Sequence, residues 1–225
     1  MTGVHPGGGS PMQGARHARR REPPDRKSMP MLADTLRNFL ALLTAGLLSP
    51  RPVARRVIDA RPDLSARLAM VALGATIQAL FYTLAGLVSG SGERFGLGGL
   101  VVLVAVSMVN YALTVALALH VGRRFGGSGD GESVAAAIAW HAILSAALSP
   151  LQVAALSGGT VGPEIGLGGL LLITAYAGLN IWLLAACIAE AHRFPGTGRV
   201  AAAVVAAFLL LGVALWLLVG GIRQG

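Results

Sequence analysis

The sequence predicts an all-α membrane protein, a bundle of five transmembrane helices preceded by amphipathic helices along the membrane surface. Of the 225 residues, 54% are hydrophobic and only 12% are charged, and the mean hydropathy is +0.68. In soluble domains, roughly a quarter of the residues are charged. Uncharged runs, each long enough to cross a hydrocarbon core, fill most of residues 68–222. The composition therefore excludes a soluble enzyme.

The first 30 residues are rich in Gly, Pro and Arg and have no apolar periodicity. Such a composition is typical of a disordered basic tail, because it cannot bury enough surface to offset the entropy of ordering. No apolar run follows the cluster Arg19-Arg20-Arg21, so we expect no cleavable signal. Met29 and Met31 are alternative starts, since the patterned sequence begins there.

Residues 31–67 are predicted to form an amphipathic segment on the cytoplasmic face or at the interface. Leu36, Phe39, Leu40 and Leu43 recur at the spacing of one helical face. The prolines of Ser49-Pro50-Arg51-Pro52 end this first helix, and a second short helix is expected over 53–60. These helices either lie on the lipid surface or cap the bundle, and the sequence leaves both alternatives open.

Five spans follow, since each of five runs exceeds the roughly 20 residues that one crossing needs. The expected ranges are 68–92, 95–122, 134–156, 165–188 and 200–222. Pro150 lies inside the third range, so we expect a kink or break near Ser149. Small residues four apart, such as Ala135/Ala139 and Ala142/Ala146, predict close helix packing.

The basic residues determine the expected orientation. With the amino terminus in the cytoplasm, the inner segments hold 16 Lys and Arg, and the outer segments hold only Arg94 and Arg223. Arginine is preferred over lysine alongside heavy use of Ala, Gly and Val, which indicates a GC-rich bacterial genome. We therefore expect the bacterial inner membrane, with a cytoplasmic amino terminus and a periplasmic carboxyl terminus. Because the net charge is concentrated before residue 68, we expect no nucleic-acid partner.

Polar residues inside the spans are few and uncharged, which argues against an ion-driven pump. They are Gln78, Asn110, His120, His141, Gln152 and Asn180. The first interpretation is that these residues form hydrogen bonds between helices. A solute pathway lined by Asn110, Gln152 and Asn180 is the alternative, and it would make the chain a small transporter or permease subunit.

Sites for metals, cofactors or catalysis are not expected. No two histidines are four residues apart, Cys187 is the only cysteine, and the glycine run 126–131 follows no strand and carries no lysine. An intramembrane enzyme would have to use His141, His192 and Glu190, without a nucleophile among them. The glycine run is better explained as a turn, with Asp130 or Gly131 capping the third span and Glu132 in its first helical turn.

Two motifs resemble the Yip family, the Ypt/Rab-interacting membrane proteins, and in particular its small alphaproteobacterial members. They are Gly-Gly-x-Gly-x-x-Glu at 126–132 and Ala-Glu-Ala-His-Arg-Phe at 189–194, and the similarity extends over about residues 32–222. Eukaryotic members of this family bind prenylated Rab-type GTPases and act in vesicle traffic. The resemblance implies a five-helix architecture and a non-enzymatic, membrane-organising or protein-docking role, with Glu132 and Glu190 at the places of the family's acidic motifs.

We therefore predict a cytoplasmic docking surface at both motifs and the neighbouring basic helix. Its residues are Arg51, Arg55, Arg56, Glu132, Glu190 and His192. Membrane lipids and another membrane or cytoplasmic protein are the expected partners. Association of the chain with itself is compatible with the same pattern.

Overall fold

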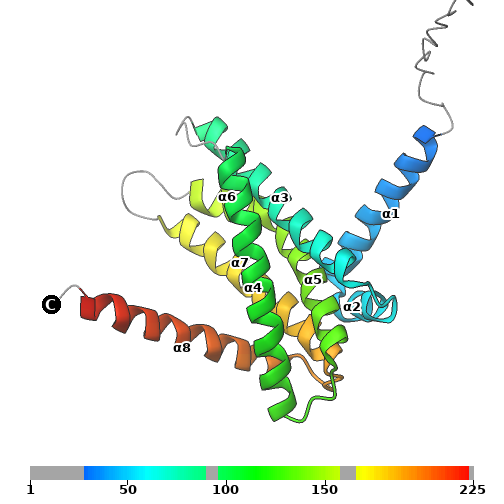
Figure 1. Cartoon of the computed structure of the whole chain (residues 1–225). Helices are drawn as coiled ribbons and strands as arrows, with labels where there is room; N and C mark the ends of the chain where they lie inside the picture. Colours follow the sequence, from blue (N-terminus) through cyan, green and yellow to red (C-terminus); the bar gives the residue numbers. More distant parts are fainter. Residues whose placement is uncertain (1–27, 90–95, 158–165, 223–225) are drawn as a thin grey trace, which may run out of the picture. The chain divides into compact units, whose positions relative to one another are not determined.

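The computed structural model describes residues 28–89, 96–157 and 166–222, and every regular element in these ranges is a helix (Figure 1). The helices are α1 (Ser28–Leu48), α2 (Pro50–Asp59), α3 (Leu64–Ser89), α4 (Leu97–Arg124), α5 (Gly131–Ala147), α6 (Ser149–Ser157), α7 (Leu167–Ala191) and α8 (Gly198–Ile222). The all-α fold class is confirmed for the described residues.

The chain forms two compact units, residues 1–38 and residues 39–225. In the first unit, α1 begins at Ser28, so the last three residues of the expected disordered tail are helical. The rest of that tail lies outside the described residues. The second unit contains the end of α1 and the helices α2 to α8, and the sections below concern this unit.

Three helices are long and apolar enough to cross a membrane: Leu64–Leu87 within α3, α4 as a whole, and α7 as a whole. The third predicted span is two helices, α5 and α6, of 17 and 9 residues. α8 has 25 residues, and its fully described part, Gly198–Leu210, is apolar. The structure thus confirms a membrane protein built of helices, whereas five crossings stay a prediction.

The break between α5 and α6 lies where the sequence predicts it. α5 ends at Ala147, and the carbonyl of Leu148 accepts the backbone N–H groups of Leu151 and Gln152 at 3.0 and 3.2 Å. Pro150 lies in the first turn of α6, where its missing N–H costs no helical hydrogen bond. The proline therefore ends one helix and starts the next.

α5 forms the core of the second unit and packs against α2, α3, α4 and α7. Ala137 and Ala139 are completely buried. A Cβ atom on Gly74 of α3 would come within 2.8 Å of the Ala142 carbonyl oxygen, so the two backbones touch there. Close approach through small residues is confirmed at Ala142, although the sequence analysis did not single out Gly74.

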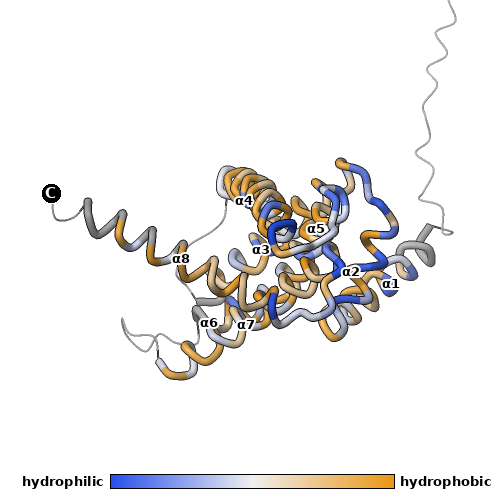
Figure 2. Tube along the Cα trace, turned by 90° about the horizontal axis from the view of Figure 1, so that it is seen from below, coloured by the Kyte–Doolittle hydropathy of each residue, from blue (hydrophilic) through white to orange (hydrophobic). Residues whose placement is uncertain are grey.

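Of the three helices long enough to cross a membrane, α4 is the least buried. Large apolar side chains such as Val102, Val109 and Leu113 are exposed along it. Figure 2 shows α4 as hydrophobic over most of its length, whereas hydrophilic residues gather around α2 and nearby turns. Exposed apolar surface of this extent is what contact with lipid requires.

Candidate functional site

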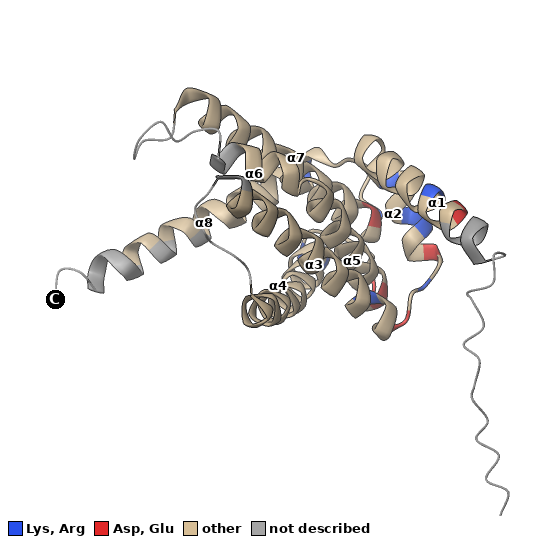
Figure 3. Cartoon of the chain, turned by 90° about the horizontal axis from the view of Figure 1, so that it is seen from above, with Lys and Arg blue, Asp and Glu red and all other residues tan. Residues whose placement is uncertain are grey.

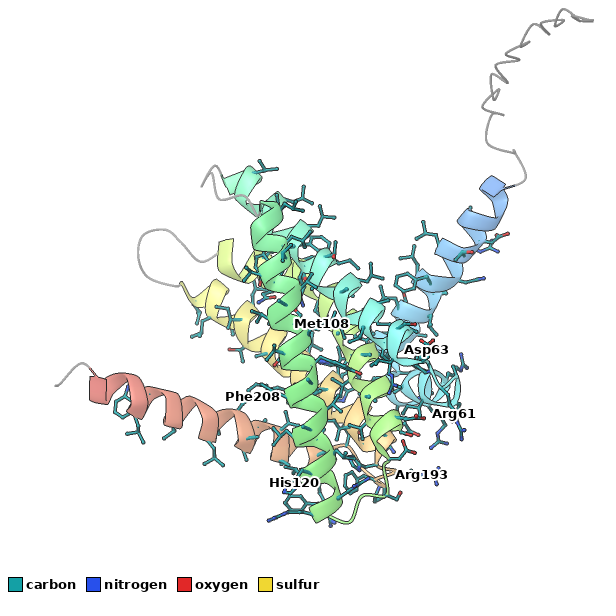
Figure 4. The ribbon with its side chains drawn as sticks, viewed as in Figure 1. Arg61, Asp63, Met108, His120, Arg193 and Phe208 are labelled. Atoms are coloured by element: carbon teal, nitrogen blue, oxygen red, sulfur yellow. The ribbon has the colours of Figure 1, made fainter. Side chains whose placement is uncertain are left out.

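Charged residues of the second unit gather at one end of the helix bundle. Within its described residues, every Asp, Glu and Arg lies in one of three segments, 51–67, 123–132 and 190–199 (Figure 3). We call these three segments the charged end. Figure 4 shows Arg61 and Asp63 at the turn between α2 and α3, and Arg193 just after α7.

Hydrogen bonds join the three segments of the charged end. Arg51 and Arg55 reach Glu190, and Gly129 donates its backbone N–H to His192 Nδ1 at 3.3 Å. The turn between α4 and α5 therefore contacts the end of α7. The two motifs, predicted to share one side of the membrane, contact each other through Gly129 and His192.

Glu190 is the centre of an ion-pair cluster between α2 and α7. Its side chain is only 6% exposed, Arg51 Nε donates to Oε2 at 3.1 Å, and Arg55 Nε donates to Oε1 at 2.5 Å. The two arginines are four residues apart, so they lie on one face of α2. Val53 and Val57 bury the apolar face of α2 against the core, which fixes this helix in place.

Arg51 also closes the carboxyl end of α7. Its Nη2 donates to the carbonyl oxygen of Phe194 at 2.8 Å, and its Nη1 donates to that of Pro195 at 3.3 Å. The last carbonyls of a helix have no partner within the helix and carry partial negative charge. A guanidinium at this position satisfies neighbouring acceptors and complements that charge.

His192 is buried to 1% exposure immediately after α7. Because its Nδ1 accepts the Gly129 N–H, the ring proton of the neutral form lies on Nε2, which donates to the carbonyl of Ala118 at 3.1 Å. Burial lowers the pKa of His192, and Arg123 lowers it further, against a smaller opposing effect of the Ala118 hydrogen bond. The imidazole is therefore a neutral connector between α4, the turn after it and α7.

Glycines surround the His192 ring because no side chain fits there. A Cβ on Gly122 would collide with Nε2, and a Cβ on Gly127 or Gly129 would come within 2.6 or 2.8 Å of Nδ1. Gly126 has φ +83° and ends α4, with its N–H bonded to Arg123 and the next N–H bonded to Gly122. These are the bonds of a Schellman motif.

The α5 end of this turn is closed by a side chain. Asp130 accepts the backbone N–H of Ser133 at 2.7 Å, which confirms the cap predicted from the sequence. This hydrogen bond is the main reason that the pKa of Asp130 is lowered, and the positive charge of Arg61 contributes to a smaller extent. Arg61 on the first segment thus acts on Asp130 in the second.

The predicted docking residues divide into two groups. Arg51, Arg55 and Glu190 come together in the ion-pair cluster, and His192 is buried beside it. Arg56 and Glu132 are exposed. Trp140 of α5 is 3% exposed and belongs to the core.

Two sets of contacts were missed from the sequence. The carbonyls of Phe194 and Pro195 carry no side-chain signal, so their role as acceptors for Arg51 is visible only in the fold. The glycines of the first motif were noticed, but nothing in the sequence shows that they and Gly122 surround His192. Among the described residues, no group of three or more His, Cys, Asp or Glu is placed to hold a metal ion.

The polar residues Asn180 and Asn110 of the spans lie in different surroundings. Asn180 is held by three side chains: its Oδ1 lies 3.0 Å from His141 Nε2, and its Nδ2 donates to Ser145 Oγ at 2.8 Å and Tyr176 Oη at 3.3 Å. Asn110, by contrast, lies on the exposed surface of α4. The network around Asn180 joins α5 to α7, as expected of hydrogen bonds between helices.

The family model of the Yip1 domain matches residues 45–219. The matched range runs from the end of α1 into α8 and includes the whole charged end. No curated protein and no solved structure matches the chain significantly. Because the family model covers well over half of the sequence, with the membrane helices and both motifs inside it, this chain belongs to the Yip1 domain family.

Proposed function

We propose that this chain is a non-enzymatic adaptor of a bacterial inner membrane, which docks a protein or organises lipid through its charged end on the cytoplasmic face. The observation that carries the proposal is that buried and exposed charged-end residues have different roles. Glu190 and His192 are buried and hold the segments together, while Arg55, Arg56 and Glu132 are exposed on the surface that results. A fixed scaffold that presents exposed charges suits recognition of a partner.

Helix contacts support five crossings. α3 and α7 each contact both α5 and α6, so the broken pair runs along the same two neighbours as one span would. Together α5 and α6 extend from Gly131 to Ser157, which exceeds the length of one crossing. With α8 as the fifth span, the amino and carboxyl termini lie on opposite sides.

Charge supports the orientation. The charged end holds nine arginines and five acidic residues, and basic residues near span ends are retained in the cytoplasm. Alkaline phosphatase fused after residue 225 should be active, and the same enzyme fused in the turn at Ser128 should not. Activity of the Ser128 fusion would contradict the proposed side.

The side chains at the charged end are poorly placed for catalysis. Glu190 is engaged by two guanidinium groups, and both ring nitrogens of His192 are engaged by backbone groups. A general acid or base needs an atom free to exchange a proton with substrate. Asn180, engaged by three side chains, and the exposed Asn110 likewise give little support to a transporter.

Photo-cross-linking in native membranes tests the docking role. A photoreactive amino acid at Arg56 or Glu132 should give one defined adduct, and the same group at exposed Leu209 on α8 should not. Glu132→Arg should lower the yield at position 56 severalfold, because it reverses an exposed charge on the proposed surface. Adducts that are identical at 56 and 209, or unaffected by Glu132→Arg, would count against the adaptor.

A further inference from the structure

The exposed face of α4 carries one polar side chain in the middle of a 28-residue apolar helix. Asn110 is the residue in question. Its side chain makes no hydrogen bond in the part of the chain that the structure describes. At this depth lipid offers no hydrogen-bonding groups, so an unpaired amide in the bilayer costs free energy. Contact with another polar group at the same depth would remove this cost.

Residues around Asn110 repeat as the contact face of a helix pair does. Val102, Val109 and Ala116 are seven residues apart, as are Val106 and Leu113, and all five are exposed. This spacing keeps one stripe facing a partner helix along several turns. Asn110 lies between Val106 and Leu113 on the same exposed side of the helix.

We propose that α4 packs against α4 of a second copy of this chain, with the two Asn110 amides hydrogen-bonded to each other across a twofold axis. An amide is both donor and acceptor, so the same residue on an identical helix is its exact complement. In a twofold interface each residue meets its own symmetry mate or exchanges partners with it. A different protein would need its own polar group at the same depth, and lipid has none.

The opposite side of α4 is already occupied. Met108, labelled in Figure 4 near the middle of the helix, and Val115 pack against the core of the chain. The proposed contact therefore uses only the side that remains open, and it leaves the packing within each copy unchanged. Substitutions on this face should alter association without unfolding the protein.

Cysteine cross-linking of the full-length chain in its native membrane tests the pairing. The native Cys187 is buried, so the wild-type chain is the background. Under mild oxidation, Val109→Cys and Leu113→Cys should give disulfide-linked dimers, whereas Val115→Cys, on the opposite side of the same helix, should not. Asn110→Leu in the Val109→Cys chain should lower the dimer fraction about threefold to tenfold, and Asn110→Gln should preserve it.

Each other outcome overturns the proposal. Absence of dimers at both 109 and 113 would mean that lipid alone covers this face. A disulfide adduct of another mass would mean that a different protein covers it. Dimers that persist unchanged with Asn110→Leu would mean that copies meet without the amide pair.

Discussion

Arg51 and Glu190, 139 positions apart in sequence, join α2 to α7 through Nε and Oε2 at 3.1 Å. The same guanidinium donates to the carbonyl of Phe194 at 2.8 Å. One side chain thus neutralises a buried carboxylate of α7 and binds the turn that follows this helix. α2 is therefore a structural part of the bundle, as the alternative of a cap on the bundle requires for this helix.

Glu190→Gln should destabilise the protein by about 2 kcal/mol, because it leaves Arg51 and Arg55 without their counter-charge. Breaking a fully buried pair costs about 3–5 kcal/mol, and the smaller value is expected because the Arg55 side chain is 65% exposed. Unfolding followed in detergent measures the change. Glu132→Gln, at an exposed position, is the control and should stay within about 0.5 kcal/mol. Equal losses in the two variants would contradict the cluster.

Lysine should replace Arg55 more easily than Arg51. Arg51 serves three acceptors, the Glu190 carboxylate and the carbonyls of Phe194 and Pro195, and a planar guanidinium can reach all three. Arg55 meets only Glu190 and is mostly in solvent. Arg51→Lys should therefore lower the melting temperature by several degrees more than Arg55→Lys. The reverse order would show that α7 does not depend on this cap.

Gly122→Ala should destabilise the charged end strongly, because the new methyl group would occupy the space of the His192 imidazole. We expect a loss of about 1–3 kcal/mol, typical of overpacking. Gly178→Ala on α7 is the matched control, since a Cβ there meets nothing within 4 Å. In a helix interior that change should be neutral or stabilise by up to about 1 kcal/mol. Combining Gly122→Ala with His192→Ala should restore part of the loss.

Apolar periodicity, together with prolines and helix-capping residues, predicts most of the helices. The break at Pro150 and the Asp130 cap depend on local chemistry, and both were predicted correctly. Pairings across the bundle were not predicted, because Glu190 and His192 are only two residues apart and nothing in the sequence shows that they face different helices. Only the fold shows that Glu190 contacts arginines of α2 and that His192 contacts the glycines after α4.

The number of crossings is the weaker part of the sequence prediction, and length explains why. An uncharged run of 23 residues such as 134–156 satisfies the rule for one span, yet the chain divides it into α5 and α6. Hydropathy is insensitive to a backbone break within an apolar run. The contacts of α5 and α6 with the same two helices, α3 and α7, show how the broken pair is arranged, which composition alone cannot show.

Acidification should loosen the charged end through His192. Its folded-state pKa lies below the ordinary value of 6.5 mainly because burial disfavours the charged imidazole. As the pH falls below 6.5, the unfolded chain binds a proton that the folded chain does not, so stability decreases. Asp63 and Asp130 also have lowered pKa values, but their ordinary value of 3.8 places their effect in more acidic solution.

Melting temperatures between pH 7.5 and 5 test the effect of His192. The wild-type chain should lose stability over this range, and His192→Asn should lose less, because it cannot bind the proton. His120, exposed on α4, provides the control, since His120→Asn should keep the wild-type dependence. A wild-type melting temperature that does not change with pH would refute the buried neutral imidazole.

Arg193→Gly should stabilise the protein by about 0.5–1 kcal/mol. Arg193 has φ +56°, a left-handed conformation that costs a residue with a Cβ roughly 1–2 kcal/mol. The chain adopts it because the end of α7 is a Schellman motif, in which the N–H groups of Arg193 and Phe194 bond back to Glu190 and Ala189 at 3.1 and 2.8 Å. Glycine relieves the strain, although its greater freedom in the unfolded chain offsets part of the gain.

The matched control is Arg124→Gly, at the last residue of α4. Both arginines are exposed and lie at the charged end, so the two substitutions remove the same charge. Arg124 is helical, and glycine there should destabilise by up to about 1 kcal/mol. Chemical unfolding should therefore shift in opposite directions for the two variants. A loss of stability with Arg193→Gly would mean that the arginine side chain contributes more than its backbone strain costs.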